Sequence, residues 1–301
     1  LETIADYSEI LVGLLRQHGI DTPIVHNSAN PGMNAYFQPV IERLGRQFLL
    51  GSDHYYTLGQ DWAQNNPTPQ YAVRSFVSLE MMRLMGFPPT VFEIPGGSCS
   101  NWPPVLPSDA LTCYLTNLAY GMKGSNYYIF TGGPNPPGVG TTTDLYDYDA
   151  SISAQGEIRP LYAAQQTFGS LAHQHPALLT GKRLSDVRIA MNLEYARSEH
   201  YWKTGGELLV SNVEAWNFLR KGVLSTALCA SYSPEFINLD SDEWIDDLAT
   251  PLVLVSSASL SCAIQQRLAA FVQRGGKLLV TPILPWLDEN LAPCSLLADL
   301  L

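Results

Sequence analysis

The sequence has few charged residues, and basic residues are scarcer than acidic ones. Asp, Glu, Lys and Arg make up 15% of the 301 residues, and 17 basic against 28 acidic side chains give a formal net charge of -11. Phosphate backbones and anionic lipid headgroups repel a chain with this charge. We therefore expect neither nucleic acid nor membrane as a partner.

Long apolar runs and metal-binding spacings are also absent from the sequence. No apolar run approaches the roughly 20 residues of a membrane-spanning helix. The cysteines are far apart and form no CxxC pair, which argues against a zinc site and against a dense disulfide framework. They are Cys99, Cys113, Cys229, Cys262 and Cys294. No His, Asp and Glu cluster has metal-ligand spacing, and neither nucleotide-binding glycine motif occurs, so we expect no metal and no cofactor.

The two ends of the chain suggest a piece of a longer protein. The sequence begins Leu1-Glu2-Thr3, without an initiator methionine or a signal peptide, and it stops at Leu300-Leu301 within a pattern typical of a helix or turn. We expect an N-terminal part to be missing.

Residues 22–175 alternate between predicted strands, polar loops and predicted helices four times. The apolar patterns predict strands over 22–26, 47–51, 88–92 and 126–130, with helices over 5–18, 40–44, 71–85, 110–122 and 156–171. This alternation is typical of a parallel sheet with crossover helices. We interpret residues 1–178 as strands 5–8 of a (β/α)8 barrel. Half a barrel has two open edges and an exposed inner face, so we expect the other half upstream of Leu1.

The pattern of predicted strands and helices changes after a predicted linker over residues 176–184. Strands over 186–193, 252–256 and 277–281, with helices within 206–219 and over 260–273, predict a second α/β domain over 179–301. Its pattern is that of a flavodoxin-like or Rossmann-like sheet. Neither Cys229 nor Cys262 lies in a G-x-C-x-G turn that would expose a nucleophile. We therefore expect this domain to serve structure and oligomer contacts.

The candidate site is organised around Glu93. An apolar run over 88–92 leads into this carboxylate, Pro95-Gly96-Gly97 interrupts the strand, and Trp102 follows. Barrel enzymes keep their catalytic groups at the C-terminal ends of such strands. The alternative is a structural Glu paired with a nearby Arg.

Several motifs resemble β-galactosidases of glycoside hydrolase families 35 and 42, both of clan A. Residues 126–135, NYYIFTGGPN, are similar to the last barrel strand of family 35, which reads NYYMFHGGTN, with Pro134 in place of Thr. Residues 146–150, YDYDA, are similar to the YDYDAP segment that follows it. Residues 92–96 and 101–102 resemble the nucleophile segment of family 42.

The second domain carries further similarity to family 42. Residues 192–195 and 274–277 resemble its amidotransferase-like domain, often a trimerisation element. The resemblance as a whole implies a homo-oligomer that binds a β-galactoside or a related oligosaccharide.

The resemblance implies a retaining β-galactosidase with Glu93 as the nucleophile. Such an enzyme needs a second carboxyl, about 5–5.5 Å away, as acid and base. In these families it belongs to an Asn-Glu pair before a helix like residues 6–11, and no such pair precedes that helix here. Glu2 and Glu9 are the nearby carboxylates, but their places in or beside the helix do not suit the role. We expect the acid/base upstream of Leu1, and the 301-residue chain alone to be inactive.

Further residues are predicted to contact the sugar. Tyr128 and Tyr148 follow from the resemblance, with core tyrosines as the alternative. Trp102 is a candidate sugar platform, or a packed loop residue. The remaining members end the second strand and could contact the substrate or orient Glu93, with a capped loop as the alternative: Asp53, His54, Tyr55 and Tyr56. Tyr146 and the strand-end residue Asn27 are further candidates.

Two other functions are to be weighed against the glycosidase. A carbohydrate-binding or scaffold protein could retain the barrel pocket without catalysis. An esterase-type hydrolase lacks support, because no GxSxG motif occurs.

Overall fold

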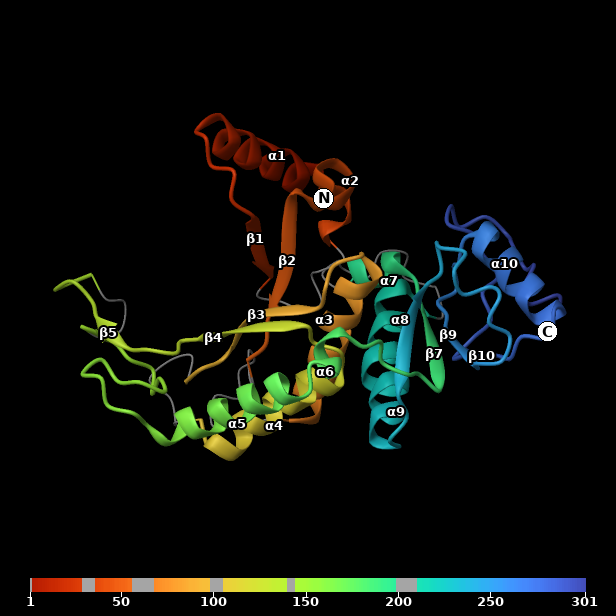
Figure 1. The fold of residues 1–301 in the computed structure, drawn as a ribbon. Coiled ribbons are helices and arrows are strands. Elements are labelled where there is room, and N and C mark those ends of the chain that lie inside the picture. Colours follow the sequence, from red (N-terminus) through yellow and green to blue (C-terminus); the bar gives the residue numbers. More distant parts are fainter. Residues whose placement is uncertain (1, 29–35, 56–67, 98–104, 140–143, 199–209) are drawn as a thin grey trace. The chain divides into compact units, whose positions relative to one another are not determined.

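The computed structural model describes residues 2–28, 36–55, 68–97, 105–139, 144–198 and 210–301 (Figure 1). The chain divides into two compact units, unit 1 (Leu1–Arg183) and unit 2 (Leu184–Leu301). This division lies close to the boundary that the sequence predicts after residue 178. None of the described helices combines the length and the apolar character needed to cross a lipid bilayer.

Unit 1 contains a four-stranded parallel sheet whose strands follow one another in chain order. The strands are β1 (Ile24–Ser28), β2 (Phe48–Asp53), β3 (Thr90–Pro95) and β4 (Gly124–Tyr128). Every step across the sheet goes in the same direction, so right-handed crossovers place the connecting helices on one face. A (β/α)8 barrel is built in the same way, with the opposite face turned inward. We call this opposite face of the sheet the inner face.

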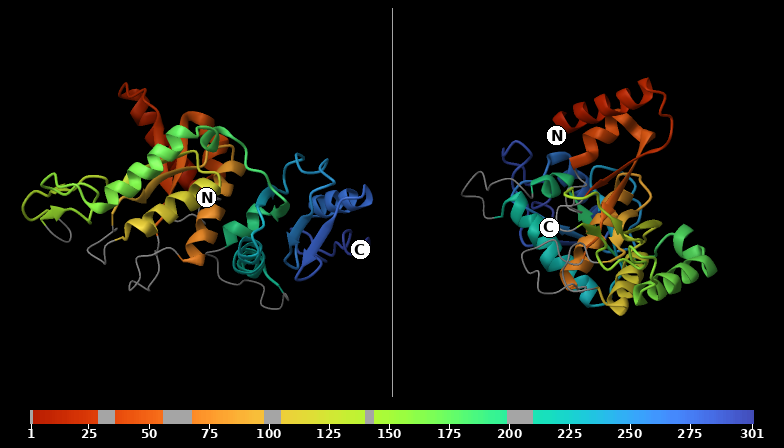
Figure 2. Two further views of the ribbon diagram at one scale, coloured as in Figure 1. Left: turned by 60° about the horizontal axis from the view of Figure 1, so that its bottom comes forward. Right: turned by 90° about the vertical axis from the view of Figure 1, so that its left-hand side faces the viewer.

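The helices of unit 1 cover the outer face of the sheet. They are α1 (Glu2–Gln17), α2 (Gln38–Leu44), α3 (Pro69–Leu84), α4 (Pro107–Ala119) and α5 (Pro160–Gln174). Proline, whose backbone has no N–H to leave unpaired, is the first residue of α3, α4 and α5. Buried side chains of α3 and α4, among them Leu79 and Tyr114, pack with Val91 and Ile94 of β3. Figure 2 shows α4, in yellow, and α5, in green, side by side.

Two features of unit 1 differ from the sequence prediction. The predicted linker over 176–184 contains a short helix, α6 (Ala177–Thr180). The loop after β4 forms a small antiparallel pair, β5 (Gly133–Pro134) with β6 (Leu145–Tyr146). Each element is only a few residues long, so neither shows a hydrophobic period that sequence analysis could detect.

Unit 2 contains a second parallel sheet, with the strand order β10-β9-β7-β8. The strands are β7 (Val187–Met191), β8 (Pro234–Asn238), β9 (Leu252–Val255) and β10 (Leu278–Thr281). Read from β8 to β10, and with the strands numbered by their order along the chain, the sheet has the order 2-1-3-4. A flavodoxin-like sheet begins in this order. Strand β8 was not predicted, because Pro234 and Glu235 interrupt its apolar pattern. The amidotransferase-like character of the domain stays a prediction.

The helices of unit 2 lie on both sides of its sheet, with α8 and α9 on one side and α10 on the other (Figure 1). They are α7 (Leu193–Arg197), α8 (Asn212–Phe218), α9 (Ser225–Cys229) and α10 (Cys262–Gln273). The helical segment extends beyond residue 219, where the predicted helix ended. A π-helical segment, Leu219–Leu224, carries the chain through Gly222 directly into α9.

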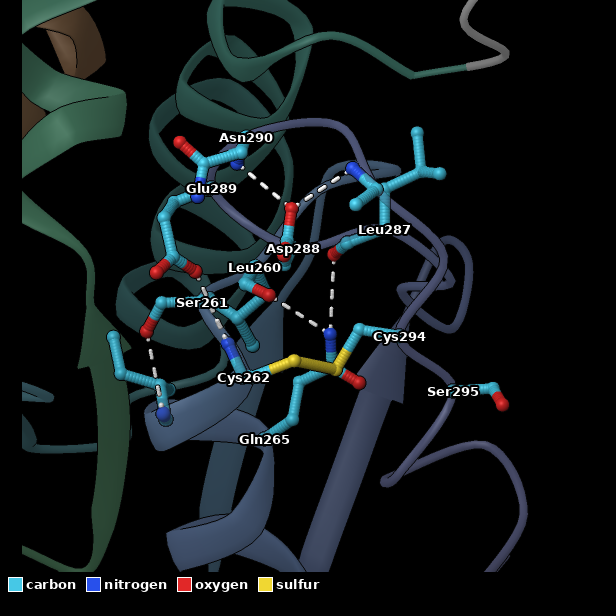
Figure 3. Close-up of a disulfide and its surroundings, with 12 residues drawn as sticks. Leu260, Ser261, Cys262, Gln265, Leu287, Asp288, Glu289, Asn290, Cys294 and Ser295 are labelled. Atoms are coloured by element: carbon cyan, nitrogen blue, oxygen red, sulfur yellow. Dashed lines mark hydrogen bonds between the residues drawn. A yellow bond between two sulfur atoms is a disulfide. The ribbon is translucent and has the colours of Figure 1, made fainter.

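A disulfide joins Cys262, the first residue of α10, to Cys294 in the segment after β10 (Figure 3). The Glu289 carboxylate accepts a hydrogen bond from the Cys262 backbone N–H at 3.3 Å. The thiol of Cys262 is therefore not free to act as a nucleophile. Among the cysteines that the structure describes, Cys113, which is buried, and Cys229, which is exposed, form no disulfide.

Candidate functional site

The carboxyl ends of β1, β2 and β3 bring three polar side chains together on the inner face. The register of β2 and β3 pairs Asp53 with Glu93. Asn27 of β1 pairs with Gly51, two residues before Asp53, so Asn27 and Asp53 lie on the same face. We call Asn27, Asp53, Glu93 and the adjacent Tyr55 the Glu93 cluster.

Neutral donors hold both oxygens of the Glu93 carboxylate. The Asn27 amide nitrogen donates to Glu93 Oε1 at 3.1 Å, and the Tyr55 hydroxyl donates to Oε2 at 2.5 Å. The same amide nitrogen also donates to both oxygens of Asp53, at 2.9 and 3.1 Å. In the described part of the chain, no Lys, Arg or His side chain forms an ion pair with Asp53 or Glu93. The alternative of a structural Glu–Arg pair has no support from these residues.

A β-bulge and one glycine position the Glu93 side chain. The register between β2 and β3 shifts by one residue at Phe92. Such a bulge re-aims the side chains beside it. A Cβ on Gly51 would lie 2.2 Å from the Phe92 ring, so only glycine leaves room for this ring. Glu93 consequently belongs to β3 itself, whereas the sequence predicted a strand that ends at residue 92.

Burial and neighbouring charge set the protonation of the cluster. Burial raises the pKa of Asp53 to about 6; the Asn27 hydrogen bond opposes this shift and the negative charge of Glu93 adds to it. Burial, followed by the hydrogen bond to Glu93, raises the pKa of Tyr55 far above its ordinary range. Tyr55 is therefore a protonated donor at neutral pH.

Three tyrosine rings extend the cluster away from Glu93. The Tyr128 ring lies 6.3 Å from that of Tyr55, edge to face, and the Tyr128 and Tyr146 hydroxyls share a hydrogen bond. The Tyr146 ring is 4.8 Å from that of Tyr148. The predicted residues Tyr128 and Tyr148 thus connect to Glu93 through Tyr55 and Tyr146.

Close packing against the end of β3 fixes the loop that carries Tyr146 and Tyr148. Arg159 donates two hydrogen bonds to the Asp147 carboxylate, at 2.6 and 2.8 Å. A Cβ on Gly97 would lie 2.3 Å from the Tyr148 carbonyl oxygen. The glycine after Pro95-Gly96 is therefore needed so that the two backbones can approach each other.

Not all predicted site residues join the cluster. His54 alternates with Asp53 along the chain and faces α4, where its Nδ1 lies 2.6 Å from Asn117 Oδ1. Burial lowers the pKa of His54 to about 4, against the effect of the Asn117 hydrogen bond. This buried, neutral imidazole does not line the site, contrary to its predicted contact with substrate. Tyr56 and Trp102 lie outside the described residues.

The sequence pointed to Tyr55 as part of the strand-end group with Asp53, and to Asn27 and Tyr146 as further candidates. Tyr55 is two residues after Asp53, a spacing that puts both on one side of an extended chain. The place of Asn27 beside Asp53 and Glu93 depends on the register between strands, which the sequence pattern does not show. Glu2 and Glu9 of α1 form ion pairs with Arg43 of α2, which engages both carboxylates away from any catalytic role.

Unit 2 has a polar cavity of about 340 Å³ at the carboxyl ends of its strands. The hydroxyl of Ser257, beside this cavity, donates to Asn212 Oδ1 at 2.7 Å and lies 3.1 Å from the Tyr195 hydroxyl. The described lining residues include no histidine to activate a serine. This arrangement gives no support to an esterase-type site. Nowhere in the described residues do His, Cys, Asp and Glu side chains gather into a group that could hold a metal ion.

Comparison with known proteins places the chain among relatives of carbohydrate enzymes. Residues 203–301 match the family model "GLMA-like, second domain". An exo-β-D-glucosaminidase of Thermococcus kodakarensis is 28% identical over 232 residues, which are 73% of this chain and 28% of that protein. A β-1,2-glucosyltransferase of Ignavibacterium album is 24% identical over 318 residues, covering 97% of this chain and 43% of that protein. The chain thus spans less than half the length of these relatives.

Solved structures show a similar fold. A family 42 β-galactosidase from G. stearothermophilus superposes with a TM-score of 0.63 at 14% identity, over 97% of this chain and 41% of that chain. The predicted mixed α/β fold with parallel sheets is confirmed, and the structural neighbours are TIM-barrel glycosidases. Membership of family 35 or family 42 is not confirmed by this likeness.

Proposed function

We propose that this chain carries part of the active site of a retaining β-glycosidase in which Glu93 is the nucleophile. One observation carries the proposal: Glu93 lies near the C-terminal end of β3 on the inner face, with both oxygens held by neutral donors. A carboxylate without a cationic partner keeps its electron pair available for attack. The relationship to an exo-β-D-glucosaminidase supports the same reaction class.

In this mechanism a Glu93 oxygen attacks the anomeric carbon while the bond to the leaving oxygen breaks. The leaving oxygen takes a proton from the acid, and a covalent glycosyl ester forms on Glu93. Water, deprotonated by the same group acting as base, then attacks the anomeric carbon and releases the Glu93 carboxylate. Tyr55 and Asn27 orient Glu93 for the first step and stabilise its returning negative charge in the second.

We place the acid/base in a segment outside these 301 residues. Asp53 is unsuited to the role, because its side chain is only 3% exposed and binds the same amide as Glu93. The exposed side chains of Val25 and Leu49 support the proposal that further strands complete the barrel beside this sheet. They are register neighbours on the inner face, yet 59% and 41% exposed. In a closed barrel such side chains are core, so further strands would cover them.

The proposed substrate is a terminal β-glycoside. The sequence motifs support a β-galactoside, and the relationship to the Thermococcus kodakarensis enzyme supports a β-D-glucosaminide. Both sugars present an equatorial leaving group to a nucleophile on the opposite face, so the same cluster serves either. The predicted homo-oligomer contact through unit 2 stays a prediction, which a mass measurement in solution would test.

A second candidate is glycosyl transfer. The relative from Ignavibacterium album, a β-1,2-glucosyltransferase, aligns with nearly the whole chain. A transferase of this type would pass the sugar to an acceptor hydroxyl instead of water. Product analysis with an added acceptor sugar separates transfer from hydrolysis, and binding without turnover would indicate the non-catalytic carbohydrate-binding alternative.

The test uses the longer polypeptide that contains these residues, with chromogenic β-galactosides and β-D-glucosaminides. We expect Glu93→Gln to lower kcat by at least about 1000-fold, because the covalent intermediate cannot form. The matched control is Glu157→Gln, an exposed carboxylate, which should leave kcat unchanged. Turnover by a folded Glu93→Gln variant at the unmodified rate would contradict the proposal.

A further inference from the structure

Tyr55, which donates a hydrogen bond to Glu93, lies beyond the end of β2. The pairing of β2 with β3 ends where Asp53 meets Glu93. One backbone hydrogen bond follows, in which the His54 N–H donates to the Glu93 carbonyl oxygen at 2.8 Å. Among the described residues, His54 is thus the one that joins Tyr55 to the sheet.

The His54 side chain is locked on the outer face of the sheet. Its Nδ1 lies 2.6 Å from Oδ1 of Asn117 on α4, and the two residues are 2% and 0% exposed. The Asn117 amide nitrogen donates to the Cys113 carbonyl oxygen at 2.9 Å. A carbonyl oxygen only accepts, so the nitrogen must face it and Oδ1 must face His54. His54 therefore donates from Nδ1, as a neutral imidazole whose pKa burial lowers to about 4.

A buried chain of polar groups extends this lock into two helices. The Asn117 nitrogen also donates to the Tyr71 hydroxyl of α3 at 2.7 Å, and this hydroxyl contacts the Cys113 sulfur of α4. These groups lie behind the sheet, so none of them touches a sugar bound at Glu93. Hydrogen bonds in such a low-dielectric interior are stronger than in water and hold a single geometry.

The direction of the His54 side chain fixes the direction of its neighbours. Successive side chains of an extended segment point to opposite faces. With His54 held on the outer face, Asp53 and Tyr55 must both point to the inner face, where the Tyr55 hydroxyl lies 2.5 Å from Glu93 Oε2. A rotation of this segment would withdraw the hydroxyl from the carboxylate.

We propose that the hydrogen bond between His54 and Asn117 positions Tyr55 so that its hydroxyl meets Glu93. His54 is then a positioning residue for the reaction, which acts through Tyr55 and touches no substrate. The inference rests on the proposed function, since it gives Tyr55 the task of orienting the nucleophile. A displacement of about 1 Å at a reacting group can cost roughly 100-fold in rate, so a contact behind the sheet matters to the chemistry.

The first test uses two substitutions of nearly equal size. His54→Asn keeps an N–H donor close to the position of the imidazole Nδ1, whereas His54→Leu has no donor. Both are assayed in the longer polypeptide with a chromogenic β-glycoside. We expect kcat to fall about 10-fold in His54→Leu and no more than about 3-fold in His54→Asn. KM should stay within about 2-fold in both variants, because His54 does not touch the sugar.

A double-mutant cycle separates positioning from general support of the fold. In a Tyr55→Phe background no hydroxyl remains to be positioned, so adding His54→Leu should change kcat by less than about 2-fold. Asn117→Leu breaks the same hydrogen bond from the other side and should behave in the same way. Urea unfolding identifies the variants that are folded in the assay, and Asn117→Leu carries the cycle if His54→Leu does not fold.

Two results would overturn the inference. One is an equal loss of kcat in His54→Asn and His54→Leu, and the other is the same loss from His54→Leu with and without the Tyr55 hydroxyl. Glu93→Gln, assayed in the same series, tests the proposed function separately. If Glu93→Gln is inactive while the cycle is additive, the inference fails and the proposed function stands. If Glu93→Gln remains active, the proposed function itself fails.

Discussion

At the scale of single residues, the two oxygens of Glu93 have different neighbours. Tyr55 donates to one oxygen and Asn27 to the other, and burial keeps the Tyr55 proton in place. Hydrogen bonds to a charged group contribute about 1.5–3 kcal/mol each. Removing either donor should therefore impair the reaction measurably without abolishing it.

Tyr55→Phe is expected to lower kcat about 10- to 100-fold, because the carboxylate loses a charge-assisted hydrogen bond while the ring is kept. Steady-state kinetics on the longer polypeptide measures the loss. The control is Tyr232→Phe, at a tyrosine of unit 2 that is 55% exposed, where no change is expected. An unchanged kcat in Tyr55→Phe would show that its hydroxyl has no part in the chemistry.

His54 should make the protein less stable in acid. Its pKa is lowered from 6.5 to about 4 in the folded state, so the unfolded state binds a proton first as the pH falls. The stability held by neutral His54 is fully present above pH 6.5 and decreases as the pH falls towards 4. The decrease amounts to roughly 3 kcal/mol.

Urea unfolding of wild type and His54→Gln at pH 7, 5.5 and 4 measures this contribution. The difference in free energy of unfolding between the two proteins should shift in favour of the variant as the pH falls. A difference that stays constant over this range would mean that His54 titrates normally.

At the scale of elements, each strand of the four-stranded sheet in unit 1 was predicted from its apolar run, and the sequential parallel order from the strand–helix alternation. The bulge at Phe92 was not predictable, because it depends on contact with Gly51 across the sheet. Register decides which polar side chains become neighbours, and a local pattern does not encode it. Asp53, Glu93 and Asn27 could therefore be picked as strand-end residues, whereas the hydrogen bonds that join them could not be predicted.

The contact between Gly97 and the loop of Tyr148 gives an element-scale prediction. Gly97→Ala would put a methyl group 2.3 Å from a backbone oxygen, so the loop must move. We expect a loss of roughly 1–3 kcal/mol in stability, with a lower kcat. Gly133→Ala is the matched control, since a Cβ there meets no atom within 4 Å. Thermal unfolding and kinetics of both variants test this. Equal behaviour of the two variants would contradict the packing argument.

At the scale of the whole molecule, composition and pattern predict two α/β parts, and the structure divides into two compact units. Strand β8 and the continuation of its preceding helix through Gly222 were missed, because tertiary packing overrides a proline and a glycine that locally disfavour these elements. The disulfide could not be assigned from five dispersed cysteines, since pairing depends on the fold.

The Cys262–Cys294 disulfide should stabilise unit 2. It closes a loop with a sequence separation of 32, which corresponds to roughly 3–4 kcal/mol of lost entropy in the unfolded chain. Replacing both cysteines by serine should lower the midpoint of unit 2 in calorimetry and leave unit 1 unchanged. The control variant Cys229→Ser removes an exposed cysteine that forms no disulfide, without opening a loop. An unchanged midpoint in the first variant would contradict this contribution.

The central claim is that Glu93 forms a covalent bond to the sugar. Incubating the longer polypeptide with a 2-deoxy-2-fluoro β-glycoside that has an activated leaving group should trap this bond, since the fluorine slows the hydrolysis of the ester. Mass spectrometry of the digested protein is expected to find one added sugar on the peptide that contains Glu93, and none in Glu93→Gln. An adduct on any other residue, or turnover of this glycoside without an adduct, would contradict the account.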